Sequence, residues 1–517
     1  MPPNRFLIVD GYTDEPSGLG VPPYIDVYPR YAAGVVWEEL GPHATVHYVT
    51  VDELRLYKWM SRLPTYDVVI FIAGVTVPGK YLDGNPATPE ELIRWARIID
   101  GPFKILAGPA ARFGLGERGG TLAYSPRDFQ RAGFDVVVSG DIDVYLRQLI
   151  KDGQERAEHW RMRKSYAELG TAPVKGARIV RMHRRFGHGL VAELETYKGC
   201  ARWVSGGCSF CIEPLYGKPR SRSLNDIIAE VEALYSNGVI DFRIGRQSDF
   251  YTIGSEKLGV DEWPRPNPDY VERLLRGIRN VAPGLRTLHV DNANPGTLVR
   301  YPQESVRITK SLVRFHTPGD VLALGLETAD PRVIKLNNLN THPEESLEAI
   351  KVINRIGGFR DGNGVPHLLP GVNFVLGLPG ETSETLELNK VFLEQILREN
   401  LLVRRVNVRR LLVLPGTRVS RMKYKSRARI MVKHRSFIRW VREHFDPIMF
   451  SRVFPAGTII RNVYIESSRD DYSYGRPPGS YPPTIRMPRV LPRLSLVDVV
   501  VEGVASGRSL QARLLER

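Results

Sequence analysis

The sequence is poor in cysteine and has no long hydrophobic run. Only three of its 517 residues are cysteines, and all of them lie in the stretch ETYKGCARWVSGGCSFCIEP at 195–214. An odd number of cysteines makes a poor disulfide framework, and in a reducing compartment a tight group of thiols is more often a metal site. The longest apolar runs, such as 68–75, are far shorter than the ~20 residues that cross a bilayer. We therefore expect neither a disulfide-stapled domain nor a membrane segment.

Basic residues outnumber acidic ones, with 72 Lys and Arg against 57 Asp and Glu and a formal net charge of +15. This charge favours contact with polyanions, RNA included, although many basic proteins simply carry solvated Lys and Arg side chains. The first residues, MPPNRFLIVDGY, contain one basic residue and no small-residue cleavage pattern, so they do not resemble a secretory signal. The expected location is the cytoplasm.

The spacing of apolar runs predicts an α/β chain in several parts. Residues 1–150 alternate short apolar strands with helical stretches, which predicts a doubly wound parallel sheet. Residues 151–189 are polar and basic without steady periodicity and are interpreted as a linker or surface segment. Strand–helix units fill 190–445, and six of them would form about three quarters of a (β/α) barrel. Pro/Gly turns and short β-like runs at 446–517 predict a small, mostly β C-terminal module.

The three cysteines, Cys200, Cys208 and Cys211, follow the first predicted strand of the barrel directly. Three thiolates can bind zinc with a fourth ligand, for which His188 or His289 is available, or they can hold three corners of a 4Fe-4S cluster. Structural zinc usually uses two separated pairs of close ligands, whereas this chain has one CxxC and one outlying cysteine. A position at the carboxyl end of a barrel strand, where barrel active sites are built, favours the cluster.

The cysteine stretch resembles the signature of the radical SAM superfamily, which is CxxxCxxC with an aromatic residue just before the last cysteine. The local match is GGCSFC, with Phe210 in the aromatic place. The first gap is seven residues instead of three, so Ala201 to Gly207 must form a longer loop. The resemblance implies an oxygen-sensitive 4Fe-4S cluster with one open iron, which binds S-adenosylmethionine and reduces it to a 5′-deoxyadenosyl radical. A reducing partner of the ferredoxin or flavodoxin type is then required.

Three further motifs follow in the order of the superfamily. LGLET around Glu327 resembles the fourth-strand segment whose acidic group contacts the adenosylmethionine in the methylthiotransferase and oxygen-independent coproporphyrinogen oxidase branches. GLPGET, with Gly377 and Gly380, resembles a fifth-strand motif, and LPGT at 414–417 resembles the end of the sixth strand. In the alternative interpretation Glu327 caps a helix or forms an ion pair, and the glycines serve only a tight turn.

Polar residues after the second and third barrel strands complete the candidate site. Gln247 and Asp249, in GRQSDF, stand where the superfamily often holds the methionine amino group, and Asn292, in VDNANP, ends the third strand. The resemblance implies cofactor binding by these three residues. The alternative is that they are ordinary loop residues.

The absence of other cysteines narrows the chemistry that the resemblance allows. Sulfur insertion by the methylthiotransferase route needs a second cluster, and dual-cysteine RNA methylation needs two further thiols; this chain has neither. The N-terminal 150 residues resemble the cobalamin-binding domain of corrinoid-dependent members, which implies cobalamin as a further cofactor. The DxHxxG motif that ligates cobalt is absent, and His43 in GPHAT does not fit it. A domain that binds no corrinoid is therefore the alternative.

The C-terminal tail is placed like the small β-barrel of tRNA-modifying relatives, and the stretch 404–442 before it has no acidic residue. Phosphate contacts and base stacking are one hypothesis for this stretch, and an exposed amphipathic helix is the other. The residues concerned are Lys423, Tyr424, Lys425, Arg427, Arg429, Lys433, Arg435 and Phe437.

Overall, the chain resembles a mainly archaeal group of radical SAM proteins. The predicted function is radical chemistry on an unidentified substrate, either RNA modification or corrinoid-dependent methylation. The alternative is a metal-stabilised RNA-binding protein without radical chemistry.

Overall fold

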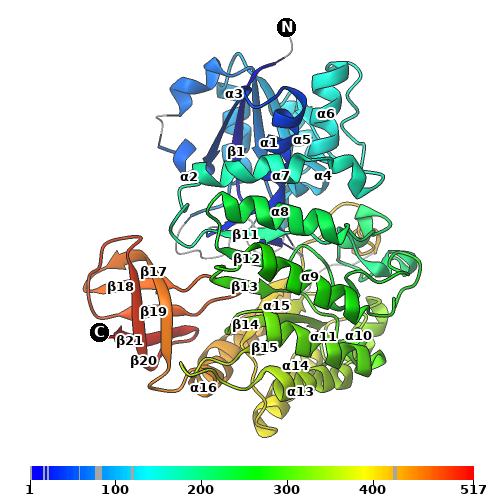
Figure 1. The fold of residues 1–517 in the computed structure, drawn as a ribbon. Coiled ribbons are helices and arrows are strands. Elements are labelled where there is room, and N and C mark those ends of the chain that lie inside the picture. The colour runs from blue at the N-terminus through cyan, green and yellow to red at the C-terminus, as the bar shows by residue number, and fades with distance from the viewer. Residues whose placement is uncertain are drawn as a thin grey trace.

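The computed structural model divides into an N-terminal α/β part, a larger half-open barrel below it and a small β-barrel at the side (Figure 1). The residues that the structure describes are 3–15, 18–19, 23–56, 59–75, 84–117, 121–422 and 428–516. None of the described helices is long and apolar enough to span a membrane. The fold class expected from the sequence is confirmed.

The N-terminal part contains a five-stranded parallel sheet in the order β10-β7-β6-β1-β5. Its strands are β1 (Arg5–Asp10), β5 (Thr45–Thr50), β6 (Val68–Ile72), β7 (Phe103–Ala107) and β10 (Val136–Val137). Numbered along the chain, this is the doubly wound order 2-1-3-4-5, which binds ligands at the carboxyl edge between its first and third strands. That edge lies between β1 and β6.

Helices cover both faces of this sheet because its strands are apolar on both faces. Phe6 and Ile8 of β1 pack with one group of helices, and Leu7 and Val9 pack with the other. The first group is α1 (Val27–Glu39) and α6 (Ile142–Asp152); the second is α2 (Val51–Leu54), α3 (Pro89–Ile98) and α5 (Pro126–Ala132). Shorter elements are α4 (Pro109–Phe113), η1 (Met60–Thr65), and the hairpins β2 (Asp14–Glu15) with β3 (Gly18–Leu19) and β8 (Leu115–Glu117) with β9 (Thr121–Tyr124).

The segment expected to be a basic linker is packed against the N-terminal part. It contains η2 (Tyr166–Leu169), α7 (Ala172–Gly176) and η3 (Ala177–Met182). Helix α7 approaches α1 so closely that a Cβ added at Gly34 would lie 1.9 Å from the Ala172 carbonyl oxygen. The helices of this segment are too short to repeat a 3.6-residue pattern of apolar residues, and α7 packs against α1 through backbone atoms. The sequence therefore shows no helical period here.

The larger barrel consists of two parallel sheets, β13-β12-β11-β4 and β14-β15-β16. A bridge between Ala293 and Leu324 links them. The first sheet has β11 (Val191–Leu194), β12 (Asp241–Ile244) and β13 (Thr287–Val290), and it gains β4 (Tyr24–Ile25) from the N-terminal part. The second has β14 (Asp320–Glu327), β15 (Leu368–Leu376) and β16 (Arg405–Arg410).

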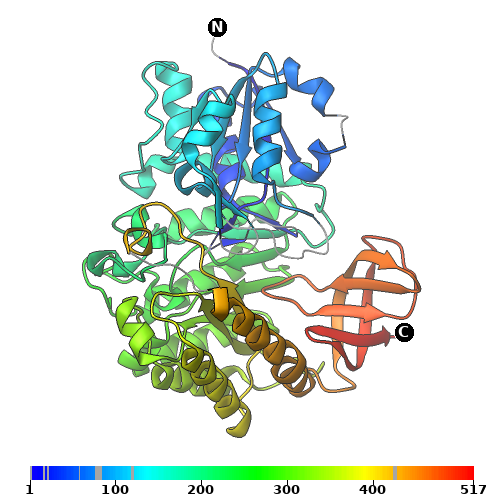
Figure 2. The same cartoon turned by 180° about the vertical axis from the view of Figure 1, so that it is seen from behind.

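Helices follow the barrel strands and lie outside them (Figures 1 and 2). They are α8 (Leu224–Ser236), α9 (Pro268–Val281), α10 (Pro295–Arg300), α11 (Pro302–Phe315), α12 (Pro331–Leu336), α13 (Pro343–Gly357), α14 (Ser383–Arg398) and α15 (Ala428–Trp440). Phe437 of α15 is buried, with its ring edge-on to Phe374 of β15. The expectation that Phe437 could stack on bases is therefore wrong, because its face of the helix covers the barrel. Lys423, Tyr424, Lys425 and Arg427 lie outside the described residues.

The C-terminal module is a closed β-barrel in the order β17-β18-β19-β21-β20. A helix, α16 (Asp446–Val453), leads into it. Its strands are β17 (Ile459–Arg469), β18 (Tyr472–Arg476), β19 (Thr484–Met487), β20 (Leu496–Ser506) and β21 (Ser509–Leu514). Between β18 and β19 the chain reaches back into the larger barrel, where the Ser480 hydroxyl donates to the Val290 carbonyl oxygen at 3.0 Å.

Candidate active site

The cysteine loop follows β11 and turns back on two glycines. Residues 201–205 form a short 3-10 turn, and Gly206 and Gly207 then have φ of 79° and 64°. A Cβ at Gly207 would come within 2.3 Å of the Pro214 ring. Only glycine fits this return, which brings the three cysteines to one cavity of about 170 Å³ at the carboxyl ends of the strands.

Burial disfavours free thiolates at this cavity. It raises the pKa of Cys200 to about 12 and raises the pKa of both Cys208 and Cys211 above the ordinary thiol value. A metal that deprotonates a coordinated thiol reverses this preference. The three sulfur atoms in one cavity are therefore compatible with a metal cluster, whose charge would hold them as thiolates.

Arg202, which the sequence reasoning did not single out, fixes the cysteine loop from within. Its Nη1 donates to the Cys208 sulfur at 3.3 Å and to the Asn338 carbonyl oxygen at 2.7 Å. Its Nε donates to Glu262 Oε1 at 2.8 Å. The guanidinium opposes the effect of burial on the Cys208 pKa. The only feature of the sequence that indicated this role was a basic residue within the unusually long stretch between the first two cysteines.

Asp249 connects the loops that follow β12 and β13. Its carboxylate accepts hydrogen bonds from the Tyr251 and Asn294 backbone N–H groups at 3.1 and 3.2 Å and from the Thr297 hydroxyl at 2.7 Å. Burial raises the pKa of Asp249 to about 6. The residue lines the same cavity as the cysteines.

Asn292 and Glu327 reach the cavity from the ends of β13 and β14, both with the left-handed backbone that non-glycine residues rarely adopt. Their φ angles are 56° and 67°. The Asn292 amide donates to the carbonyl oxygens of Gly245 and Gln247, each at 2.9 Å. Burial raises the pKa of Glu327 to about 8, although Arg409 lowers it. Strained residues at strand ends are typical of functional sites.

Gln247 does not line the described cavity. It is fully buried, and its Nε2 donates to the carbonyl oxygens of Ile244 and Asp291 at 2.8 and 3.0 Å. Its Oε1 accepts a hydrogen bond from the Thr196 hydroxyl at 3.2 Å. The structure thus places Gln247 as a cross-link between the ends of β11, β12 and β13.

Gly377 and Gly380 also stand outside the residues that line this cavity. They shape a turn with φ of 87° and 85°, and a Cβ at Gly380 would come within 2.8 Å of Leu336. The turn still reaches the cysteine loop, because the Asn337 amide donates to the Pro379 carbonyl oxygen at 2.8 Å while its own oxygen accepts from the Ser209 hydroxyl at 2.7 Å. Beside Ser209, the ring of Phe210 lines the cavity.

Neither histidine considered as a fourth zinc ligand lines the cavity. His289 Nδ1 accepts from the Ser480 backbone N–H at 2.8 Å, and the His188 ring lies edge-on to Tyr464. Among the described residues, no three His, Cys, Asp or Glu side chains are placed to hold a single metal ion. The zinc interpretation therefore lacks the ligands that the sequence offered for it.

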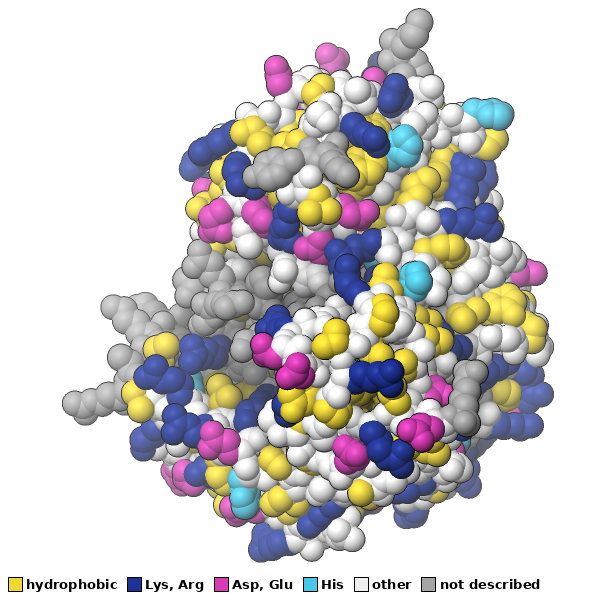
Figure 3. Space-filling view, turned by 90° about the vertical axis from the view of Figure 1, so that its left-hand side faces the viewer, with side chains coloured by type: hydrophobic (Ala, Val, Ile, Leu, Met, Phe, Trp, Pro, Cys, Tyr) yellow, Lys and Arg dark blue, Asp and Glu magenta, His cyan; other side chains and the backbone are white. Residues whose placement is uncertain are grey.

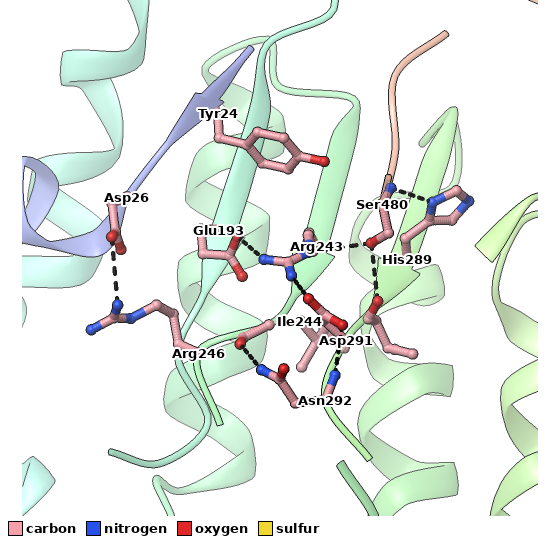
Figure 4. Close-up of polar contacts among 12 residues, drawn as sticks. Tyr24, Asp26, Glu193, Arg243, Ile244, Arg246, His289, Asp291, Asn292 and Ser480 are labelled. Carbon is pink, nitrogen blue, oxygen red and sulfur yellow. Dashed lines mark hydrogen bonds and ion pairs between the residues drawn. The ribbon is translucent and has the colours of Figure 1, made fainter. Parts of the chain in front are cut away.

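A charge network fills the barrel interior beside the first three strands (Figure 4). Arg243 lies between Glu193 and Asp291, with its Nη1 donating to Glu193 Oε2 at 2.5 Å and its Nη2 paired with Asp291. Its Nε donates to the Ser480 hydroxyl at 3.2 Å. Burial raises the pKa of Glu193 to about 7. Sequence reasoning missed this network, whose signal was a charged residue inside each of two short apolar strands, Glu193 in VAEL and Arg243 in DFRI.

Three cysteines at the carboxyl edge of an open, parallel barrel are the arrangement expected of an iron–sulfur enzyme. The model of the "Radical SAM superfamily" matches residues 194–390, and the chain belongs to this superfamily.

Two archaeal relatives resemble the chain over most of its length. An uncharacterized protein of Methanocaldococcus jannaschii is 41% identical over 481 residues, which covers 92% of this chain and 87% of that protein. An uncharacterized protein of Archaeoglobus fulgidus is 39% identical over 517 residues, or 99% of this chain and 90% of that protein.

One of the solved structures that resemble this chain shares its fold over most of the length. It is the radical S-adenosylmethionine methyltransferase TsrM from Kitasatospora setae with cobalamin and a 4Fe-4S cluster bound. The likeness has a TM-score of 0.50 at 16% identity and covers 80% of this chain and 74% of TsrM. At this identity the comparison concerns the fold alone.

Proposed function

We propose that this protein cleaves S-adenosylmethionine reductively at a 4Fe-4S cluster held by Cys200, Cys208 and Cys211. The observation that carries the proposal is the meeting of these cysteines with Asp249 and Glu327 in one cavity. When bound, the cluster supplies the electron that breaks adenosylmethionine into methionine and a 5′-deoxyadenosyl radical, which acts on a substrate. The three cysteines would each hold one iron of the cluster, which would leave the fourth iron for the amino acid part of the cofactor.

The polar residues of the cavity suit a cationic cofactor. A carboxylate whose pKa is about 8 when buried, as for Glu327, gains stability as an anion when a positive ligand lies beside it. Adenosylmethionine carries a sulfonium and an amino group. Asp249 and Asn292 hold the strand-end loops in place and line the cavity, while Phe210 supplies an aromatic surface.

Anaerobic reconstitution tests this function directly. The reconstituted protein is expected to contain about four irons per chain and, after reduction with dithionite, to convert adenosylmethionine into 5′-deoxyadenosine. Iron and sulfide analysis and liquid chromatography give the two readouts. Protein that takes up a single zinc ion and forms no 5′-deoxyadenosine would overturn the proposal.

A corrinoid at the N-terminal sheet is a second proposal, carried by the strand order of that sheet. Its carboxyl edge meets the carboxyl end of the barrel: Val75 and Phe113 pack with Ile212 and Leu414, and Arg112 donates to the Leu215 carbonyl oxygen at 2.7 Å. A cofactor bound at that edge would therefore face the cysteine cavity. With a corrinoid the reaction would be a methyl transfer.

Expression with cobalamin in the medium decides whether a corrinoid binds. The purified protein is expected to show corrinoid absorbance in proportion to chain concentration. Protein that carries its full iron content but no corrinoid would refute the second proposal and leave the first standing.

The alternative of an RNA-binding protein has less support. Part of the positive charge is internal, since Arg30, Arg185, Arg222 and Arg243 are among the largest fully buried side chains. On the face in Figure 3, Lys and Arg side chains are dispersed and have Asp and Glu side chains among them. The remaining support for RNA as a substrate is the C-terminal β-barrel, which is placed like the small β-barrel of tRNA-modifying relatives.

A further inference from the structure

The cysteine loop carries an exposed apolar surface that nothing in the site uses. Trp203 and Val204 are 37% and 45% exposed, and Val260, in the adjoining segment, is 58% exposed. The Trp203 indole N–H donates to the Gly259 carbonyl oxygen at 3.0 Å, so the ring is held in place. We call Trp203, Val204 and Val260 the loop patch.

The loop patch lies very near the cysteines. Val204 is four residues from Cys200 and four from Cys208, so even an extended chain would keep its Cα within about 14 Å of theirs. The 3-10 turn at 201–205 makes the separation shorter. A protein that docks on the patch is thus separated from the cluster site by little more than this loop.

Two exposed basic side chains flank the loop patch. Arg418 Nη1 donates to the Gly207 carbonyl oxygen at 3.4 Å, and the Lys218 side chain lies against Gly259. Within the described part of the chain neither has an acidic partner, whereas the neighbouring carboxylates Asp261 and Glu262 are paired with Lys257 and Arg202. The surface therefore offers an apolar centre with positive charge beside it.

The proposed function needs an electron that the chain cannot supply itself. Each cleavage takes one electron, and with all three cysteines committed to one cluster no thiols remain for a second. We propose that the loop patch, with Arg418 and Lys218, is the docking surface for an acidic ferredoxin, whose cluster gives up one electron as the enzyme's cluster gains it. This inference rests on the proposed function.

A ferredoxin suits this surface for two physical reasons. An iron–sulfur carrier gives up one electron at a time, which matches the one electron that each cleavage takes. Redox complexes are also among the smallest specific interfaces, below about 1,200 Å² in total, so a few apolar side chains with complementary charges are sufficient. Opposite charges bring the partners together and make the rate depend on salt.

The experiment compares two reductants with the same reconstituted enzyme. Trp203→Ser and Arg418→Glu are each expected to lower the rate of 5′-deoxyadenosine formation with reduced ferredoxin about 10-fold, through a higher KM for ferredoxin. With dithionite, a small molecule that needs no docking surface, both rates should stay within about twofold of the wild type. Raising the salt concentration should slow the wild type with ferredoxin only.

Matched controls carry the same changes elsewhere on the surface. Trp160→Ser replaces a tryptophan that is 60% exposed in the segment after α6, and Arg131→Glu reverses the charge of an 80% exposed arginine on α5. Both should behave as the wild type. An unchanged KM for ferredoxin in Trp203→Ser and Arg418→Glu would overturn the inference, as would an equal loss with dithionite. Absence of cleavage with either reductant in the wild type would instead reject the proposed function, and this inference with it.

Discussion

Replacing Cys208 with alanine is expected to lower iron content to a small fraction of the wild-type value and to reduce 5′-deoxyadenosine formation at least 100-fold. Two remaining cysteines cannot hold three corners of a 4Fe-4S cluster, and the described cavity offers no further thiol. Arg202 would also lose the sulfur that it contacts at 3.3 Å and would keep only oxygen partners. Iron and sulfide analysis together with the cleavage assay measures both effects.

Glu327→Gln is the matched control for this variant. It removes a carboxyl that becomes an anion beside a positive ligand, but it removes no sulfur ligand, so it should retain about four irons per chain while binding adenosylmethionine more weakly. Equilibrium dialysis with the cofactor separates the two variants. Cys208→Ala protein that keeps both its iron and its cleavage rate would refute the assignment of the cluster ligands.

Most strands of the two α/β parts could be predicted from the sequence because buried parallel strands are mainly apolar runs. The run at 68–75 contains β6 (Val68–Ile72), which is buried along its whole length between two layers of helices. Contacts between distant segments gave no such signal. The Tyr24 hydroxyl pairs with the Gly479 carbonyl oxygen across most of the chain, and β4 joins a sheet whose other strands begin at residue 191. No periodicity within either segment predicts these pairs.

The residues of the candidate site could be predicted where a short sequence motif stands at the carboxyl end of a strand. The cysteines, Asp249, Asn292 and Glu327 meet because parallel strands end at the same edge, so motifs far apart in sequence converge there. Gln247 was expected at the cofactor because of its position after the second strand, but its amide bonds to two backbone carbonyl groups and the Thr196 hydroxyl, and so joins the ends of three strands. Such a buried role depends on partners that a single sequence does not reveal.

Replacing Arg243 with methionine is expected to destabilise the folded protein by about 3–5 kcal/mol, because it leaves buried carboxylates without their cationic partner. Arg243 lies between Glu193 and Asp291 and also holds Ser480 of the segment that returns from the C-terminal module. Urea denaturation followed by circular dichroism measures the loss, and limited proteolysis should find the region around Ser480 more accessible. The matched control is Arg307→Met, which breaks an exposed pair with Asp269 and should change stability by less than about 1 kcal/mol.

The pH dependence distinguishes an electrostatic loss from a loss of packing. Burial raises the pKa of Glu193 from 4.5 to about 7, and Arg243 opposes that rise. A carboxyl with a raised folded pKa stabilises the fold while it is protonated, and that stability is lost as pH rises through the folded pKa. Without Arg243 the folded pKa of Glu193 is higher, so the variant continues to lose stability above pH 7 after the wild type has levelled off. The loss in free energy of unfolding caused by Arg243→Met should therefore be larger at pH 8.5 than at pH 6.5. Combining Glu193→Gln with Arg243→Met should recover part of that loss. A loss that is the same at both pH values and in the double variant would assign the effect to packing.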